Sequence, residues 1–316
     1  MAVHSAFRTP HSALKMRVVS LVPAATEIVA ALGAGNFLVG ISHACDYPQE
    51  VQGLPRVTYS SVDPALPAAE IDRAMAEARR TGVSPVEVDV KRVAYLRPDV
   101  IIGQSVCDVC AVGETDLARV VSVLMPTPWL VTLHAHTLEG VFNDIRKVGE
   151  ALELRDEAEE LVAGLEYRLR RVRAGTTGRG GMAGGGSVGG VGAPLQPPRV
   201  LVLEWLDPPY VAGHWVPELV ELAGGRDVGN LPGGRSASRT WPELSALAPD
   251  VLVVALCGFG EERARRDFAA VDDPAARALF SRRVGFLDGN AYTSRPGPRL
   301  VDAAAILARL IHGSNR

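Results

Sequence analysis

Residues 17–33 read RVVSLVPAATEIVAALG, and this stretch decides the fold class. Its first six residues are mostly apolar and rich in valine, which is typical of a short buried strand. Pro23 stands where a helix can begin, and the alanine-rich segment after it favours a helix that ends at Gly33. A second short strand is predicted at 37–41. This strand–helix–strand order predicts a parallel α/β arrangement.

Two later segments share the sequence P-D-V and repeat this pattern. RPDVIIG at 97–103 and APDVLVVAL at 248–256 each place a turn before an apolar run. RVLVLEW at 199–205 starts the second half of the chain with a strand, as 17–22 starts the first. The repetition predicts two α/β lobes, at 17–136 and 199–316.

Residues 137–173 separate the two lobes. Apolar residues recur there at helical spacing among many charged ones, and no proline interrupts them. A continuous helix of this length would extend about 55 Å, so a single spacer helix joining the lobes is predicted. Residues 174–198 contain a glycine-rich run followed by PLQPP, which predicts a flexible insert, and residues 1–16 are predicted to be a disordered tail.

Composition excludes several classes of function. The net charge of −3 over 316 residues offers no basic surface for a phosphate backbone, so no nucleic acid is expected as a partner. No run of about 18 apolar residues is present, so membrane insertion is not expected. Arg8 and Lys15 interrupt the N-terminal segment, and no apolar signal-peptide core follows them. A cytoplasmic location is therefore predicted.

Taken in order, these segments resemble a known family. RVVSLVPAATEIVAALG, LVGIS at 38–42, the paired P-D-V strands and the spacer resemble the class III periplasmic binding proteins, most closely their cobalamin-binding branch. The resemblance spans 17–312 apart from the glycine-rich run. It implies two Rossmann-like lobes joined by a single long spacer helix, the class III substrate-binding-protein fold. It also implies a small-molecule ligand between the lobes, small hinge motions and an ABC permease as partner.

Five further segments resemble a subgroup of that family that commonly lacks an export signal. They are SHACDYP (42–48), CDVCAV (107–112), EWLDPP (204–209), AGHWVPE (212–218) and SRPGPR (294–299). The resemblance also offers Glu27 and Glu218, one on each lobe, as exposed residues for docking on a permease. A solvated helix surface is the alternative for both.

Candidate ligand-binding residues follow the predicted strands, because ligands of open α/β sheets bind beyond the carboxyl ends of strands. Trp205, Trp215 and Tyr47 are of the kind that stack on a flat macrocycle, with ordinary core packing as the alternative. Arg295 and Arg299 suit a carboxylate or phosphate, with a capped helix start and surface arginines as the alternative. The predicted set is Tyr47, Gln104, Trp205, Asp207, His214, Trp215, Phe259, Tyr292, Arg295 and Arg299.

The four cysteines also follow predicted strands. The C-x-x-C pair at 107–110 suits Zn²⁺, an iron–sulfur cluster or a redox couple. The remaining two cysteines, with His43 and His214 as substitutes, would complete a metal site across the cleft, whereas each cysteine taken alone is better explained as a buried thiol. The predicted metal ligands are Cys45, Cys107, Cys110 and Cys257.

Binding is favoured over catalysis. No H-E-x-x-H pair is present, and Cys45 beside His43 is the best candidate dyad. The prediction is a monomeric binding protein for a cobalamin-like or other tetrapyrrole or metal-chelate ligand. The alternative is an intracellular metal, iron–sulfur or redox protein that uses the cleft cysteines and presents a metallocofactor to an accepting protein.

Overall fold

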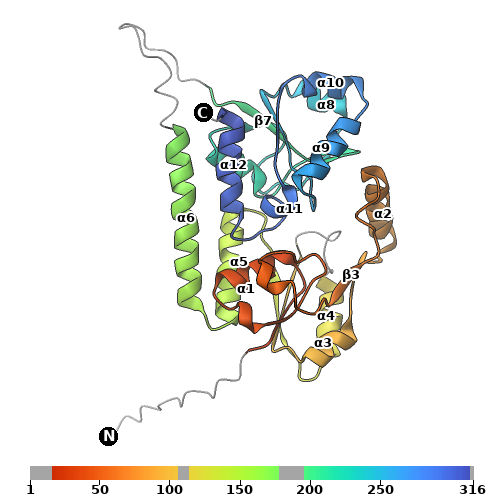
Figure 1. Cartoon of the computed structure of the whole chain (residues 1–316), viewed down its shortest axis with the longest axis vertical. Helices are drawn as coiled ribbons and strands as arrows, with labels where there is room; N and C mark the ends of the chain where they lie inside the picture. The colour runs from red at the N-terminus through yellow and green to blue at the C-terminus, as the bar shows by residue number, and fades with distance from the viewer. Residues whose placement is uncertain (1–15, 106–113, 178–195, 314–316) are drawn as a thin grey trace.

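A computed structural model describes residues 16–105, 114–177 and 196–313, which form two α/β lobes (Figure 1). In the N-terminal lobe, four parallel strands lie in the order β2-β1-β5-β6, and β3 and β4 form a separate antiparallel pair. The elements of this lobe are β1 (Val18–Ser20), α1 (Pro23–Ala31), η1 (Gly35–Phe37), β2 (Leu38–Ile41), η2 (Gln49–Val51), β3 (Thr58–Ser60), α2 (Ala68–Thr81), β4 (Val86–Val88), α3 (Val90–Leu96), β5 (Val100–Gln104), α4 (Glu114–Ser122) and β6 (Trp129–Leu133).

The C-terminal lobe has a mixed sheet in the order β10-β8-β7-β11-β12, with β9 pairing β7. β7, β11 and β12 are parallel, whereas β8 turns back antiparallel to β7. The elements are β7 (Arg199–Leu206), β8 (Pro209–Val211), α7 (Val216–Leu222), β9 (Arg226–Asp227), β10 (Ala237–Ser238), α8 (Trp241–Ala246), β11 (Val251–Val254), α9 (Glu261–Ala270), α10 (Pro274–Phe280), β12 (Arg283–Phe286), α11 (Gly289–Tyr292) and α12 (Leu300–His312). The predicted fold class, with two Rossmann-like lobes, is confirmed.

The two P-D-V motifs have the same structural role in the two lobes. The carboxylate of Asp99 accepts a hydrogen bond from the backbone N–H of Arg17, and that of Asp250 accepts one from Arg199, both at 2.8 Å. Each aspartate thus ties the turn before a central strand to the start of the neighbouring strand. This shared contact explains why the Pro-Asp-Val sequence recurs at the start of β5 and of β11.

The predicted spacer helix over 137–173 is wrong in one respect, because two helices occupy this segment. They are α5 (Leu138–Ala151) and α6 (Arg155–Thr177), which pack side by side in Figure 1. Glu153 between them has a φ of 60°, a left-handed conformation that ends α5. Gly149 lies so close to Ala158 that a Cβ there would stand 2.4 Å from the alanine Cβ, so the two helices meet tightly at this turn. The helix that extends along both lobes is α6.

A continuous apolar core passes from one lobe to the other on the side of α5 and α6. Buried residues of α1 and α5 belong to the same cluster as buried residues of α7 and α12, with Val162, Leu165 and Leu169 of α6 among them. Two further clusters fill the opposite faces of the two sheets. Because the shared core would be exposed by wide separation of the lobes, it favours small hinge motions.

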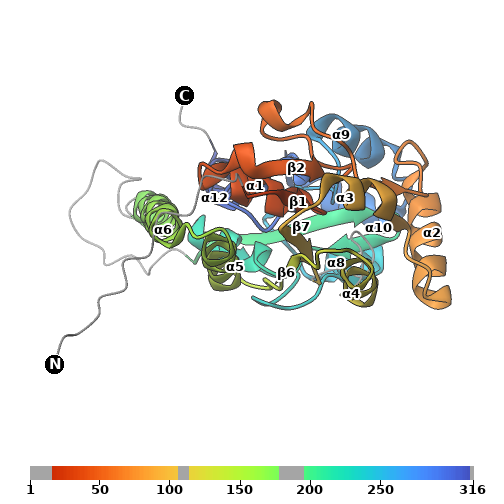
Figure 2. The same cartoon turned by 90° about the horizontal axis from the view of Figure 1, so that it is seen from below.

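On the side opposite α6, residues 61–85 form an arm that carries α2 away from the N-terminal lobe (Figure 2). The guanidinium of Arg263 in α9 donates to the carbonyl oxygens of Pro64 and Leu66 at 3.1 and 2.7 Å. The Tyr210 hydroxyl donates to Asp72 of α2 at 3.2 Å. The arm therefore contacts the C-terminal lobe directly, and we call residues 61–85 the α2 arm.

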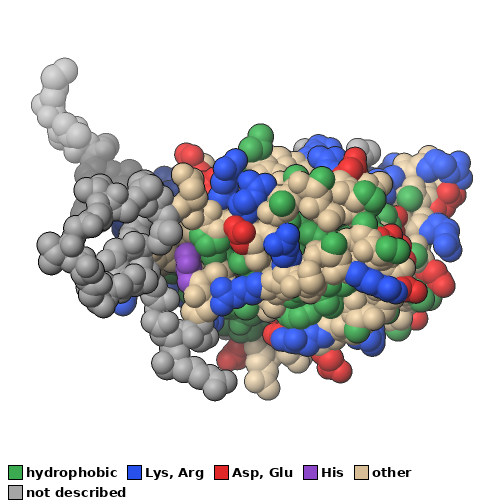
Figure 3. All heavy atoms as spheres, turned by 90° about the horizontal axis from the view of Figure 1, so that it is seen from above, with side chains coloured by type: hydrophobic (Ala, Val, Ile, Leu, Met, Phe, Trp, Pro, Cys, Tyr) green, Lys and Arg blue, Asp and Glu red, His purple; other side chains and the backbone are tan. Residues whose placement is uncertain are grey.

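Within the described part of the chain, no helix combines the length and the apolar composition needed to cross a bilayer. On the face of the C-terminal lobe seen in Figure 3, acidic and basic side chains are interspersed with hydrophobic and neutral ones. Most of the predicted glycine-rich insert (residues 178–195) and nearly all of the predicted tail (1–15) lie outside the described residues.

Candidate functional site

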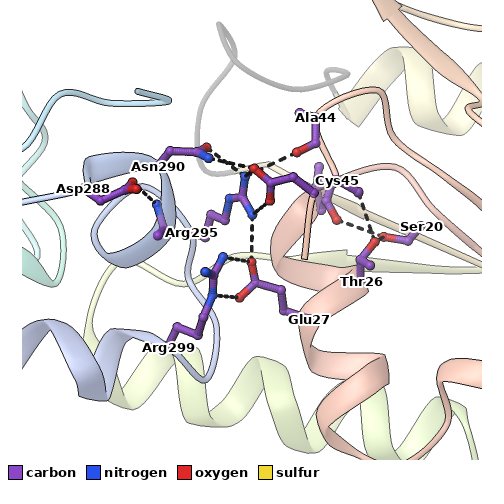
Figure 4. Close-up of polar contacts among 12 residues, drawn as sticks. Ser20, Thr26, Glu27, Ala44, Cys45, Asp288, Asn290, Arg295 and Arg299 are labelled. Carbon is purple, nitrogen blue, oxygen red and sulfur yellow. Dashed lines mark hydrogen bonds and ion pairs between the residues drawn. The ribbon is translucent and has the colours of Figure 1, made fainter. Parts of the chain in front are cut away.

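A cluster of charged side chains joins the two lobes where the loop after β2 meets the segment between α11 and α12 (Figure 4). Arg295 donates to Glu27 of α1 at 2.9 Å, to Asp46 at 3.0 Å and to the amide oxygen of Asn290 at 2.8 Å. Arg299 makes a bidentate pair with Glu27 at 2.6 and 2.8 Å. We call Glu27, Asp46, Asn290, Arg295 and Arg299 the inter-lobe cluster.

Burial and pairing together set the charges of the inter-lobe cluster. The side chains of Glu27 and Arg295 are only 2% and 4% exposed. Burial acts to lower the pKa of Arg295, but hydrogen bonds and charges from Asp46 and Glu27 outweigh it and raise the pKa. Burial likewise acts to raise the pKa of Asp46, but Arg295, Asn290 and Arg299 together outweigh it and lower the pKa. The pKa of Arg299 is raised in the same way, because hydrogen bonding to Glu27 outweighs its burial, so the pairing favours the charged forms of Asp46, Arg295 and Arg299.

This arrangement changes the expected roles of three residues. Arg295 and Arg299 were predicted to bind an anionic group of the ligand, but in the structure both are paired with carboxylates of the other lobe. Glu27 was predicted to be exposed for docking, and it is buried because it lies on the inward face of α1 against the two arginines. Glu218 is half-buried, and its carboxylate accepts the backbone N–H of Leu138 at the start of α5 at 2.8 Å.

Aromatic side chains lie beside the inter-lobe cluster and farther along the interface. The Arg299 guanidinium lies 4.2 Å from the ring centre of Tyr47 and 6.0 Å from that of Tyr292. Trp205 at the end of β7 contacts Phe259 after β11, with ring centres 5.7 Å apart. Both rings of this second pair are partly exposed.

Phe259 is linked to the N-terminal lobe through two neighbours. Its backbone oxygen accepts the N–H of Asn290, whose side chain donates to Asp46 at 2.9 Å. Its ring lies 4.8 Å below the guanidinium of Arg263, which holds the α2 arm. These contacts place the Trp205–Phe259 pair at the interface of the lobes.

The other predicted binding residues differ in accessibility. Trp215 is 4% exposed, and its indole N–H donates to the carbonyl of Thr293 at 2.8 Å, so it is a core residue in this structure. Gln104 ends β5 and is half-buried. Asp207 is exposed, and its backbone oxygen accepts the indole N–H of Trp205 at 3.1 Å.

The described cysteines do not form the predicted metal site. Cys45 is 1% exposed, and its sulfur lies 3.1 Å from the hydroxyl of Thr26. Burial is the main reason that the pKa of the Cys45 thiol is raised, which disfavours the thiolate that a metal requires. Cys257 is partly exposed, and Cys107 and Cys110 lie outside the described residues.

His43, a predicted substitute ligand, forms a hydrogen bond within the N-terminal lobe instead. Its ring nitrogen Nδ1 lies 2.8 Å from the hydroxyl of Thr58, and burial followed by the charge of Arg56 lowers its pKa. In the described ranges, no group of three or more histidine, cysteine, aspartate or glutamate side chains is arranged to hold a metal ion.

One close inter-lobe contact was missed by sequence reasoning. Nδ1 of His136, in the loop after β6, lies 3.1 Å from Nδ1 of His214, in the loop after β8. His214 was predicted as a ligand-binding residue, whereas His136 was not. The residues are 78 positions apart, so no local pattern indicates that they meet.

An open hollow of about 840 Å³ lies at the outer end of the N-terminal lobe, away from these residues. Its walls include Asp99 and Trp129, which lie at the amino ends of β5 and β6, together with Glu150 and Arg155. Ligands of parallel sheets bind at the carboxyl ends of strands, so the lobe interface remains the candidate site.

Residues 18–180 match the profile of a family described as periplasmic binding protein. The chain belongs to this family. Among curated proteins, this periplasmic binding protein is 22% identical over 157 residues to YvrC of Bacillus subtilis (strain 168), named as an uncharacterized ABC transporter substrate-binding lipoprotein. The match covers 50% of this chain and 40% of that relative, so it spans less than half of the relative's length.

Two solved structures resemble this periplasmic binding protein over nearly its whole length. The periplasmic heme-binding protein RhuT from Roseiflexus sp. RS-1 is 22% identical with a TM-score of 0.65, covering 94% of this chain and 98% of that one. The periplasmic vitamin B12 binding protein BtuF of Vibrio cholerae is 19% identical with a TM-score of 0.63, covering 93% and 96%. These likenesses establish the shared fold.

The predicted cytoplasmic location is wrong. The relatives are named as periplasmic proteins or as a lipoprotein of an ABC transporter, which are extracytoplasmic. The prediction rested on the segment before Arg17, whereas the family assignment rests on the match over residues 18–180.

Proposed function

We propose that this protein binds a tetrapyrrole, such as heme or a cobalamin, between its two lobes and delivers it to the permease of an ABC transporter. The observation that carries the proposal is the partly exposed Trp205–Phe259 pair at the lobe interface. Flat, largely apolar ligands are held mainly by aromatic and apolar walls with a few polar anchors. Relatives of the same fold are named for binding vitamin B12 and heme, which supports this ligand class.

The polar anchors proposed for the ligand are Gln104 and groups beside the inter-lobe cluster. Gln104 ends β5 and supplies an amide, and Tyr47 and Tyr292 supply hydroxyl groups on opposite lobes. Arg299 is 18% exposed, more than Arg295, so it is the arginine better placed to contact a propionate or an amide of the ligand. Because Glu27 is buried, docking on a permease is assigned to other acidic residues of the surface.

Titration of the purified full-length protein with hemin and with cyanocobalamin tests this proposal. Binding is followed by the absorption spectrum of each ligand and by calorimetry. A saturable one-to-one complex with at least one of them is the expected result. An absence of binding to both at about 100 μM, a concentration at which even weak complexes form, would leave the fold assignment intact and overturn the proposed ligand class.

A further inference from the structure

The contact between His136 and His214 brings two metal-ligating side chains from opposite lobes together. Their Nδ1 atoms are 3.1 Å apart, their ring centres are 5.2 Å apart, and the ring planes are inclined by 33°. Both side chains are only partly buried, so solvent and dissolved ions reach them. The aromatic pair that carries the proposed tetrapyrrole site, Trp205 and Phe259, includes neither histidine.

The backbone holds His214 firmly in place. Its φ of 56° is left-handed, a conformation that a non-glycine residue keeps only where its surroundings fix it. Its N–H donates to the carbonyl of Gly234 at 2.6 Å, and its own carbonyl accepts the N–H of Gly233 at 2.9 Å. The ring of Trp215 lies 5.5 Å from the imidazole. His214 is thus fixed from within the C-terminal lobe.

The loop of His136 is fixed by the N-terminal lobe. The buried carboxylate of Asp144 accepts the N–H groups of His134 and Ala135, both at 2.9 Å. On the other side, the hydroxyl of Thr137 caps α5 by accepting the N–H of Gly140 at 3.1 Å. Two independently anchored loops therefore present the two imidazoles to each other.

The distance between the nitrogen atoms suits a shared metal ion. Histidine nitrogens bind Zn²⁺ at about 2.0–2.1 Å, and two such ligands of a tetrahedral ion lie roughly 3.3 Å apart. The observed 3.1 Å differs from this by only a few tenths of an ångström. Burial, followed by the charges of His136 and Arg235, lowers the pKa of His214, which favours the neutral imidazole that a metal requires. At present one Nδ1 donates a hydrogen bond to the other, so an ion would take the place of that proton.

We propose that His136 and His214 form a two-histidine binding site for a divalent transition-metal ion, such as Zn²⁺, Co²⁺ or Ni²⁺, that bridges the lobes. Imidazole nitrogen is a preferred ligand of these ions. In the described part of the chain no third ligand joins the pair, so water molecules complete the coordination. The charge of nearby Arg235 opposes the ion only weakly, because this side chain is exposed to solvent.

A bridging ion would make the stability of the observed arrangement of the lobes depend on metal concentration. An ion that binds the native state alone adds stability as the logarithm of its concentration. The inference is independent of the tetrapyrrole, so it can fail while the proposed function holds, and the reverse is also true.

The test uses full-length, chelator-treated protein in which Cys107→Ser and Cys110→Ser remove the C-x-x-C pair as a competing site. Zn²⁺ is titrated by calorimetry, and Co²⁺ is titrated by visible absorption, which reports tetrahedral nitrogen coordination. One ion per chain and a melting temperature that rises with Zn²⁺ are expected. His136→Ala and His214→Asn should each weaken binding at least about tenfold, the scale on which metal sites respond even to indirect changes.

Two controls keep the test decisive. Asparagine tolerates the left-handed backbone at 214, so His214→Asn separates loss of the ligand from loss of the fold. His43→Ala removes a histidine that bonds to Thr58 on the N-terminal lobe, and it should bind Zn²⁺ like its parent. Unchanged binding in His136→Ala and His214→Asn, or no binding of Zn²⁺ or Co²⁺ by the parent at about 1 mM, would overturn the inference.

Discussion

Arg295 and Glu27 lie 268 residues apart in the chain and form an ion pair of 2.9 Å across the lobe interface, with both side chains almost fully excluded from solvent. Removing two charges from water costs free energy, which is recovered only when every polar atom has a partner. In the described structure, no buried side-chain nitrogen or oxygen lacks a hydrogen-bond partner. The observed arrangement of the lobes therefore depends on an intact inter-lobe cluster.

Neutralising Glu27 should destabilise the protein strongly. In Glu27→Gln the shape is kept, but the buried Arg295 and the partly buried Arg299 lose their shared carboxylate. We expect the free energy of unfolding to fall by about 3 kcal/mol, at the low end for breaking a buried pair because Arg295 retains Asp46. Urea denaturation measures this change.

The matched control for this substitution is Glu159→Gln. Glu159 pairs with Arg146 at 2.9 Å, but the two side chains are 63% and 36% exposed. Water screens such a pair, so the expected loss is below about 1 kcal/mol. An equal decrease in the free energy of unfolding in the two variants would show that burial does not determine how much the inter-lobe cluster stabilises the protein.

Asp227 should make the protein less stable as the pH rises. Burial raises the pKa of Asp227 to about 6, although the N–H groups of Asn230 and Gly229 act to lower it. The unfolded carboxyl titrates near 4, so between about pH 4 and 6 the native state holds the extra proton. The neutral Asp227 carboxyl therefore contributes its full share to the free energy of unfolding below about pH 4. This contribution is lost as the pH rises through about 6.

Replacing the Asp227 carboxyl with an amide should remove this loss of stability at high pH. Asp227→Asn keeps an oxygen that accepts the N–H groups of Gly229 and Asn230. We expect the variant to be more stable than the wild type by about 2 kcal/mol at pH 8, with the difference shrinking as the pH approaches 4. Urea unfolding of both proteins across this range gives the difference, and a constant offset at every pH would contradict the assignment.

The two described cysteines should differ in reactivity. Cys45 is 1% exposed, and burial raises the pKa of its thiol, whereas Cys257 is partly exposed after β11. Alkylation by iodoacetamide at pH 8, followed by peptide mass spectrometry, should label Cys257 at least about tenfold faster, because the thiolate is the reacting form. Similar rates in the native protein would contradict the buried position of Cys45, and denaturant should abolish the difference.

Arg263 should control the mobility of the α2 arm. Arg263→Gln removes the guanidinium that donates to Pro64 and Leu66, so amide hydrogen exchange in residues 61–85 should become several-fold faster. Arg265→Gln is the matched control, because Arg265 lies in the same helix but bonds to Glu261 instead. Equal exchange in the two variants would show that the arm is held by other contacts.

Local signals in the sequence predicted much of the fold. Pro23 occupies the first turn of α1, and the helix ends just before the left-handed Gly33, as the sequence indicates. The break between α5 and α6 was missed because Glu153 has no local preference for its left-handed conformation. Close packing of Gly149 against Ala158, which depends on the tertiary fold, accompanies that turn.

The candidate site was predictable in position but not in its pairings. Strand ends indicated that Arg295 and Phe259 lie at the lobe interface, because the rule depends only on topology. The partner of Arg295 depends on how two distant segments dock, whereas Glu27 was expected on the surface because of the family resemblance. The contact of His136 with His214 could not be predicted for the same reason, because it also depends on how distant segments dock.

The affinity of a Trp205→Ala variant for hemin and cyanocobalamin tests the central claim, binding of a tetrapyrrole at the lobe interface, most directly. Trp205 contacts Phe259 at that interface, whereas Trp129 is a tryptophan 54% exposed at the outer end of the N-terminal lobe. We expect Trp205→Ala to raise the dissociation constant at least about tenfold, as the loss of one aromatic wall implies, and Trp129→Ala to leave it unchanged. Binding that is unaffected by Trp205→Ala, or weakened equally by Trp129→Ala, would contradict a ligand held at the lobe interface.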